Sequence, residues 1–114
     1  MWDEITELSI LYDFYGDLLP GKVREIFRLY HEENLSLSEI AERFGISRQG
    51  VHENVRRAEE KLRSYENALG LVKRFTEQEA VLDRLRESVA ELSTRIPNDA
   101  LVQSMARDIA SLEA

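Results

Sequence analysis

Cysteine is absent from this 114-residue chain, and proline occurs only twice. Without cysteine there can be no disulfide framework, no thiol nucleophile and no cysteine-ligated metal site. No stretch approaches the roughly 18 consecutive apolar residues that a membrane-spanning helix needs. The first ten residues also lack the basic segment and apolar run of a secretory signal. We therefore expect a soluble protein that stays in the cytoplasm.

Histidine is scarce as well, and the patterns of known catalytic sites are missing. His31 and His52 are the only histidines, and neither has partners at metal-ligand spacing. The sequence contains no glycine-rich phosphate loop and no nucleophile elbow. The acidic pairs Glu32–Glu33 and Glu59–Glu60 are typical of a solvated surface rather than of a catalytic dyad. The sequence thus predicts a noncatalytic protein that needs no metal and no cofactor.

What the chain does have is helical periodicity. Apolar residues recur at spacings of three and four, and no segment alternates with the period of two that marks a strand, so we expect an all-α protein. A first helix before Pro20 is predicted to be mostly buried. Its apolar positions are Ile5, Leu8, Leu11, Tyr12, Phe14, Tyr15, Leu18 and Leu19. Pro20 is predicted to be the first residue of a second helix. The predicted inner face of that helix is Val23, Ile26, Phe27 and Tyr30.

Residues 36–57 carry the most specific local signal, that of a helix-turn-helix. Ser36 is placed to cap a third helix, and Glu39 completes a capping box with it. Gly45 stands where this helix should end in a left-handed conformation, which only glycine adopts without cost. Ser47 is placed to cap a fourth helix. Two short helices joined by a tight glycine turn are therefore predicted.

The fourth helix presents a polar face if Val51 and Val55 point inward. The candidate nucleic-acid-binding residues on this face are Arg48, Gln49, His52, Arg56 and Arg57. Glutamine can read adenine in the major groove, arginine can read guanine or hold phosphate, and a helix N-terminus favours phosphate. Glu53 argues against this role, because a carboxylate repels phosphate. It can pair with Arg56 or Arg57, or accept from a cytosine amine.

The charge distribution also favours this region as the site of any nucleic-acid contact. The chain has a net charge of −7, which opposes nonspecific attraction to phosphate. Residues 1–20 carry −5, residues 21–74 carry +2 and residues 75–114 carry −4. Within the middle segment, residues 43–63 carry six bases and three acids. Any nucleic-acid contact is expected there, and a solvated face of a scaffold remains the alternative.

Gly70 separates two apolar rhythms and predicts a break between a helical domain (1–69) and C-terminal helices (70–114). Pro97 should end the second run, and Asn98 is predicted to cap a last short helix. The C-terminal apolar stripe has a heptad rhythm that predicts a homodimer, with packing against the first helix as the alternative. The stripe consists of Leu82, Leu85, Val89, Leu92 and Ile96.

Two resemblances rest on longer runs of sequence. The run LLPGKVREIFRLYHEENLSLSEIAERFGISRQGVHENVRRAEEKLR, residues 18–63, resembles region 4 of bacterial sigma factors, which binds promoter DNA through a helix-turn-helix. A closer and longer resemblance is to the YlxM family of Gram-positive bacteria. It is carried by LYDFYGDLL (11–19), by SLSEIAERFGISRQGVHENVRRAEEKL (36–62), and by the later YENALGL and KRF. Together these segments cover about the first two-thirds of the chain.

The YlxM resemblance implies a sigma-region-4-like helical bundle with a C-terminal helical extension. It also implies a protein encoded beside the signal recognition particle GTPase that regulates the particle or its RNA. Our first expectation is thus a regulator that binds the particle RNA, its GTPase or both through the fourth helix. A DNA-binding transcription regulator that uses Gln49, His52 and Arg56 on base edges is the second. A protein-interaction module with the helix-turn-helix as scaffold is the third.

Overall fold

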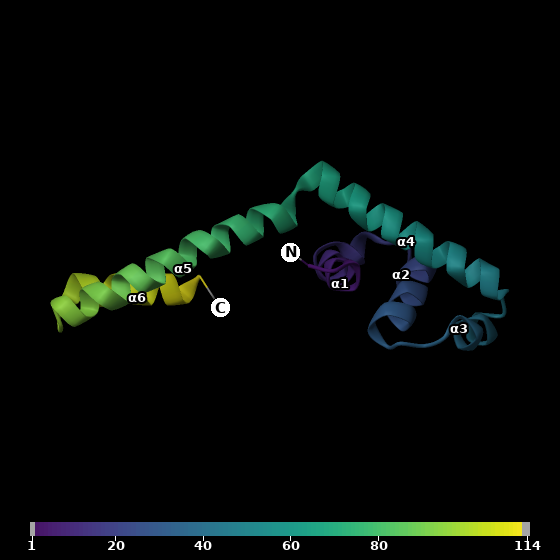
Figure 1. Ribbon diagram of the computed structural model, residues 1–114, viewed down its shortest axis with the longest axis horizontal. Helices are drawn as coiled ribbons and strands as arrows, with labels where there is room; N and C mark the ends of the chain where they lie inside the picture. Colours follow the sequence, from purple (N-terminus) through teal and green to yellow (C-terminus); the bar gives the residue numbers. More distant parts are fainter. Residues whose placement is uncertain (1, 113–114) are drawn as a thin grey trace. The chain divides into compact units, whose positions relative to one another are not determined.

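The structure, a computed structural model, describes residues 2–112 (Figure 1). Its α-helices are α1 (Glu4–Tyr15), α2 (Gly21–Phe27), α3 (Leu37–Phe44), α4 (Arg48–Leu69), α5 (Leu71–Arg95) and α6 (Ala100–Ser111). A 3-10 turn, η1 (Gly16–Leu18), follows α1, and a π-helix, η2 (Arg28–Glu32), extends α2. No strand occurs in the described residues, which confirms the all-α prediction. The chain divides into unit 1 (Met1–Val72) and unit 2 (Lys73–Ala114), which we describe separately.

The first helix is shorter and less buried than the sequence predicts. It ends at Tyr15 rather than near Pro20, and η1 turns the chain in between. Gly16 permits this turn, because a Cβ there would lie 3.0 Å from the ring of Tyr12. The prediction of a mostly buried helix is wrong. Only a narrow face is covered, while Ile5 and Leu18 are exposed.

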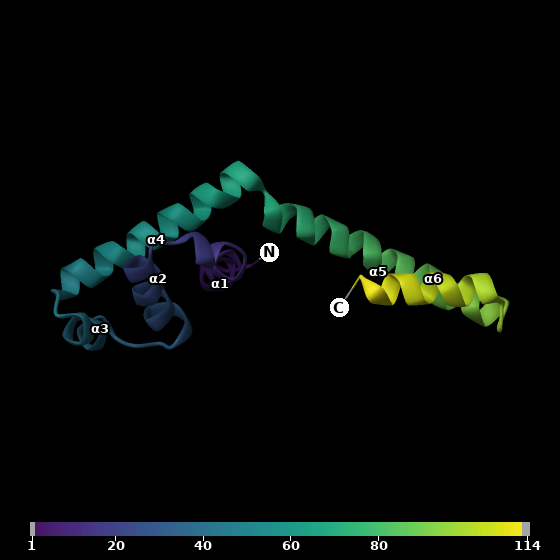
Figure 2. The same cartoon turned by 180° about the vertical axis from the view of Figure 1, so that it is seen from behind.

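Helix α4 is the spine of unit 1, since α1, α2 and α3 all pack against it (Figures 1 and 2). It is one helix of 22 residues, so the predicted short second helix of the motif continues without a break to Leu69. Two buried clusters lie along it. The first contains Leu8, Leu11, Tyr15, Leu19, Val23, Phe27, Ala58, Leu62 and Val72. The second contains Ile26, Leu29, Ile40, Ala41, Val51 and Val55.

The second helix differs from its prediction at both ends. Pro20 has an extended ψ of 146° and is the N-cap rather than the first helical residue. At the other end the chain continues as the π-helix η2, in which Leu29 is the core residue at 1% exposure and the predicted Tyr30 is only half-buried. The chain then leaves through Asn34, whose φ of 57° is left-handed. Asparagine tolerates this conformation better than most side chains.

Unit 2 is a helical hairpin, in which α6 lies beside α5 in both views (Figures 1 and 2). The helix break predicted at Gly70 is confirmed, because α4 ends at Leu69 and Gly70 has a left-handed φ of 61°. The predicted cap of α6 is wrong by one residue. Asn98 has a φ of 66° and forms the reversal, so Asp99 becomes the N-cap and accepts from the backbone N–H groups of Leu101 and Val102.

Candidate nucleic-acid interface

The helix-turn-helix begins with a capping box at Ser36. The Ser36 hydroxyl accepts from the Glu39 N–H at 3.1 Å, and the Ser36 N–H donates to Glu39 Oε1 at 2.9 Å. These bonds satisfy two backbone donors that the first turn of α3 would otherwise leave open. The bond from the Ser36 backbone is the main reason that the pKa of the Glu39 carboxyl lies below its usual value. The capping box predicted from sequence is confirmed.

Gly45 forms the turn between α3 and α4. Its φ of 65° and ψ of 36° are left-handed, and its N–H donates to the carbonyl of Ala41. A Cβ at this position would meet no atom within 4 Å, so the demand for glycine comes from the backbone conformation and not from crowding. The turn sets the direction in which α4 leaves.

The first turn of α4 is fixed by Ser47, whose hydroxyl accepts from the Gly50 N–H at 2.9 Å. The buried side chains of α4 are Val51, Val55, Ala58 and Leu62. Their spacing of four, three and four places them on one side of the helix, against α1, α2 and α3. This seam determines which side chains of α4 face the solvent.

All five candidate binding residues are exposed on α4. These are Arg48, Gln49, His52, Arg56 and Arg57. Arg48 and Arg57 have no hydrogen bond or ion pair to any side chain of residues 2–112, so both guanidinium groups are available to a ligand. The structure therefore places all five predicted residues on the solvent-exposed side of α4, with Arg48, Gln49 and His52 in its first two turns and Arg56 and Arg57 in the third.

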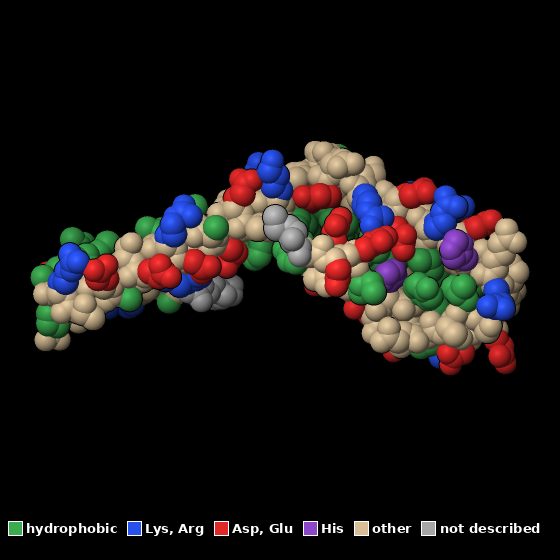
Figure 3. Space-filling view, in the orientation of Figure 1, with side chains coloured by type: hydrophobic (Ala, Val, Ile, Leu, Met, Phe, Trp, Pro, Cys, Tyr) green, Lys and Arg blue, Asp and Glu red, His purple; other side chains and the backbone are tan. Residues whose placement is uncertain are grey.

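Acidic residues interrupt this face. Arg56 lies 3.3 Å from Glu60, and both side chains are about two-thirds exposed, so water screens the pair and it contributes little to stability. Glu53 has no ion pair within the described residues, in contrast to the predicted pairing with Arg56 or Arg57. A shallow hollow of about 260 Å³ is lined by Glu53, Arg56, Arg57 and Glu60. Figure 3 shows the same mixture, with positive and negative side chains interspersed over α4.

Sequence reasoning missed a second polar cluster in unit 1. The Nε2 of His31 lies 3.3 Å from Oε2 of Glu59, and the two side chains are only 9% and 22% exposed. Glu59 is therefore not the solvated residue that its pairing with Glu60 suggests. The residues are 28 positions apart, so no local pattern could have joined them.

Two general properties of the described chain bear on its chemistry. No group of three potential metal ligands is present among residues 2–112. None of the helices in this range combines the length and apolar character that crossing a bilayer demands.

Comparison with known proteins gives a consistent family match. Residues 2–102 match the UPF0122 family, described as "Putative helix-turn-helix protein, YlxM / p13 like". A UPF0122 protein of Thermoanaerobacter sp. (strain X514) is 40% identical over 98% of both chains. One from Anoxybacillus flavithermus is 38% identical over 99% of this chain and 100% of its own. One from Geobacillus kaustophilus is 35% identical over the same shares.

Proposed function

This chain belongs to the UPF0122 family of YlxM/p13-like helix-turn-helix proteins, and from that premise we propose that it is a noncatalytic regulator of the signal recognition particle. In this proposal it acts in the cytoplasm and binds the particle RNA, the particle GTPase or both through the exposed face of α4. The choice of the signal recognition particle as the partner rests on the YlxM resemblance. The choice of α4 as the binding surface rests on the helix-turn-helix.

The observation that carries the proposal is the unpartnered guanidinium group of Arg48 beside Gln49 and His52 in the first two turns of α4, with a second unpartnered guanidinium, that of Arg57, about 13 Å further along the helix. Arginine on an exposed helix start is suited to phosphate, because the helix N-terminus adds its own positive potential. The net charge of −7 opposes generic binding to duplexes. It therefore favours a target of defined shape, such as folded RNA or a protein–RNA particle.

A pull-down tests this function directly. The tagged full chain is incubated with the purified particle GTPase, with the particle RNA, and with both. Retention of the RNA, the GTPase or the assembled particle supports the proposal and identifies the direct partner. Retention of none of them, with the bait shown to be folded by circular dichroism, contradicts it.

A second candidate is a DNA-binding transcription regulator. It is favoured by the position of Gln49, His52 and Arg56, which lie in the first turns of the second helix of the motif, where such proteins contact bases. Selection from a random duplex library separates the two candidates. An enriched sequence would favour the transcription regulator, whereas retention of particle RNA without any enriched duplex would favour the particle.

We further propose that the protein acts as a homodimer joined through unit 2. Among residues 73–112 of this hairpin, Val102 is the only buried hydrophobic residue, and a unit of about 42 residues rarely folds on such a core alone. Its exposed large apolar side chains are Phe75, Val81, Leu85, Ile96, Leu101 and Leu112. Leu85 and Ile96 of the predicted heptad stripe belong to this exposed set, whereas Leu82, Val89 and Leu92 are half-buried within the chain. A second copy is a suitable cover for the exposed part of the stripe.

Sedimentation tests the dimer at concentrations on the order of tens of micromolar. Wild type should sediment as a dimer, and Leu85→Glu should sediment as a monomer. Arg84→Glu, on the adjacent position outside the apolar stripe, is the matched control and should stay dimeric. A monomeric wild type, or identical behaviour of the two variants, contradicts pairing through this stripe.

A further inference from the structure

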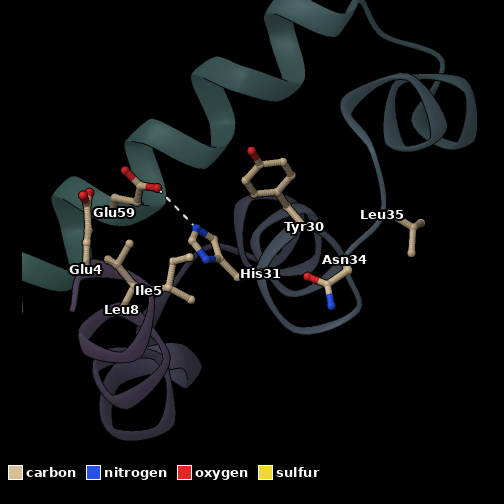
Figure 4. Close-up of a pocket in the computed structure, with 8 residues that line it drawn as sticks. All are labelled: Glu4, Ile5, Leu8, Tyr30, His31, Asn34, Leu35 and Glu59. Atoms are coloured by element: carbon tan, nitrogen blue, oxygen red, sulfur yellow. Dashed lines mark hydrogen bonds and ion pairs between the residues drawn. The ribbon is translucent and has the colours of Figure 1, made fainter. Parts of the chain in front are cut away.

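A pocket of about 410 Å³ lies on unit 1 (Figure 4), and none of the five candidate residues of α4 lines it. Glu4 and Ile5 of α1 form one side, Tyr30 and His31 of η2 form another, and Glu59 of α4 closes the pocket. In Figure 3, apolar side chains fill the surface between α1 and α3, and acidic side chains gather toward α4. The pocket thus combines an apolar interior with a negative rim.

The aromatic side of the pocket is held in place before any ligand arrives. The ring of His31 stacks on Phe27 with centroids 4.3 Å apart and meets the edge of Tyr30 at 5.3 Å. Its Nε2 lies 3.3 Å from Glu59 Oε2, and its side chain is 9% exposed. Phe27 itself is completely buried in the core cluster of α1 and α4. A ligand would therefore meet a rigid wall, which lowers the entropic cost of binding.

Several hydrogen-bonding groups around the pocket are open. Within residues 2–112, Oε1 of Glu59, the hydroxyl of Tyr30 and the carboxamide of Asn34 have no hydrogen-bond partner. Glu4 lies 3.5 Å from the guanidinium of Arg63, in a loose and exposed ion pair. The rim therefore presents acceptors, and one of its carboxylates already lies near an arginine of this chain.

We infer that this pocket takes an arginine side chain of a protein partner. The methylene stem of arginine is apolar and suits Ile5, Leu8 and Leu35, which also line the pocket. The planar guanidinium can donate several hydrogen bonds to the rim carboxylates and can stack on an aromatic ring. Lysine is a poorer fit because its compact ammonium is more strongly hydrated. Two carboxylates repel an anionic ligand.

This inference goes beyond the proposed function, since it concerns a different surface of unit 1 and does not require that α4 bind RNA. It gives the acidic start of the chain a role, because residues 1–20 carry five acids and no base. A partner with a protruding arginine would be attracted to this end of the molecule and then held by the pocket.

The test is an NMR titration of the full-length, ¹⁵N-labelled chain with a capped Gly-Arg-Gly peptide. Peptides with citrulline or lysine in place of arginine are the ligand controls. Concentrations on the order of 10 mM are sufficient, since a ligand this small should bind with a dissociation constant of roughly 1 mM. The arginine peptide should shift the amides of Tyr30, His31 and Glu59 in a saturable way, and more tightly than either control. Absence of saturable shifts, or equal affinity for citrulline, overturns the inference.

Glu59→Gln and Glu60→Gln make a matched pair, because they remove the same charge from adjacent positions and only Glu59 lines the pocket. Glu59→Gln should weaken the arginine peptide about fivefold or more, and Glu60→Gln should stay within about twofold of wild type. If Glu59→Gln fails to fold by circular dichroism, Glu4→Gln replaces it, since that side chain is 73% exposed and lies outside the core. Equal effects of the pocket and control variants would show that only net charge matters and would overturn the inference.

Discussion

Units 1 and 2 are built from the same kind of amphipathic helix, yet they bury very different amounts of it. Sixteen hydrophobic side chains are buried in residues 2–112, and all of them except Val102 lie in unit 1. Unit 2 leaves Leu85, Leu101 and Leu112 exposed. Unit 1 therefore contains a hydrophobic core that can support its own fold. The stability of unit 2 should depend on what covers it.

Helical periodicity alone therefore does not determine which helices find packing partners. In unit 1, each of α1, α2 and α3 packs one apolar face against α4. In unit 2, α5 has 25 residues and α6 has only 12, so the shorter helix can cover no more than about half of the longer one. Substitutions in the two units test this contrast.

The largest effect is expected from a core substitution in unit 1. Leu62→Ala removes a side chain that is 0% exposed and should lower the free energy of unfolding by about 2–5 kcal/mol. Leu85→Ala, at 46% exposure in unit 2, should cost less than about 1 kcal/mol in dilute monomer. Urea denaturation, monitored by circular dichroism, measures the free energy of unfolding of both variants. Equal costs would erase the contrast between the units.

The turn of the helix-turn-helix should show the next largest effect. Gly45→Val should cost more than about 1 kcal/mol, because a β-branched residue resists a φ of 65°. Gly45→Asn should be milder, since asparagine tolerates the left-handed region. Thermal melts of the three proteins provide the comparison. The same melting temperature for wild type and Gly45→Val would contradict the described turn.

A hydrogen-bonded tyrosine gives a third test, also in unit 1. The Tyr15 hydroxyl donates to Glu66 Oε1 at 2.5 Å and accepts from the Leu71 N–H at 3.0 Å. Tyr15→Phe should destabilise the protein by roughly 1 kcal/mol. Burial, followed by the bond to Glu66, raises the pKa of Tyr15 above its usual value near 10. Its contribution to stability is therefore present below pH 10 and is lost as the pH rises through the folded pKa.

Denaturation of wild type and Tyr15→Phe at neutral pH and above pH 10 checks this sign. The difference in stability between the two proteins should shrink at the higher pH. A difference that stays constant would show that the hydroxyl is not held in the bonds described.

The smallest effect is expected at the exposed capping box. The pKa of Glu39 is lowered in the folded state, so its contribution to stability is present above about pH 4.5 and is lost as the pH falls through the folded value. Glu39→Gln keeps a capping oxygen without the titration. Melting temperatures between pH 3 and pH 6 should therefore depend on pH slightly less in Glu39→Gln than in wild type. If the melting temperature of Glu39→Gln depends on pH as strongly as that of wild type, the ionised Glu39 carboxylate does not stabilise the capping box.

Local chemistry made much of unit 1 predictable from the sequence. Ser36, Gly45, Ser47 and Gly70 act within a few residues of themselves, and each is found in its predicted role. The prediction for Asn98 was wrong because two neighbouring residues, Asn98 and Asp99, can both serve as caps. Asn98 adopts the left-handed conformation of the reversal, and Asp99 is the N-cap. The capping signal was correct, but its position depended on the turn.

Long-range contacts could not be predicted in the same way. The bond from Tyr15 to Glu66 spans 51 residues and that between His31 and Glu59 spans 28, so neither leaves a local pattern. Leu29 of η2 is buried although the α-helical pattern selects Tyr30, because the chain is π-helical there, and a π-helical turn leaves no local sequence signal. The five candidate residues of α4 were accessible to sequence reasoning, since the buried seam of one helix determines its exposed face.

The central claim, that the exposed face of α4 binds the particle RNA, is tested most directly by the salt dependence of RNA binding in two charge-matched double variants. Arg48→Ala/Arg57→Ala removes the two unpartnered arginine charges from α4, and Arg84→Ala/Arg107→Ala removes two from unit 2. The α4 variant should weaken binding and lower the slope of log K against log salt by about two, while the unit 2 variant should leave the slope unchanged. Circular dichroism must show both variants folded. Equal slopes for the α4 variant and wild type would contradict the claim and make α4 a scaffold.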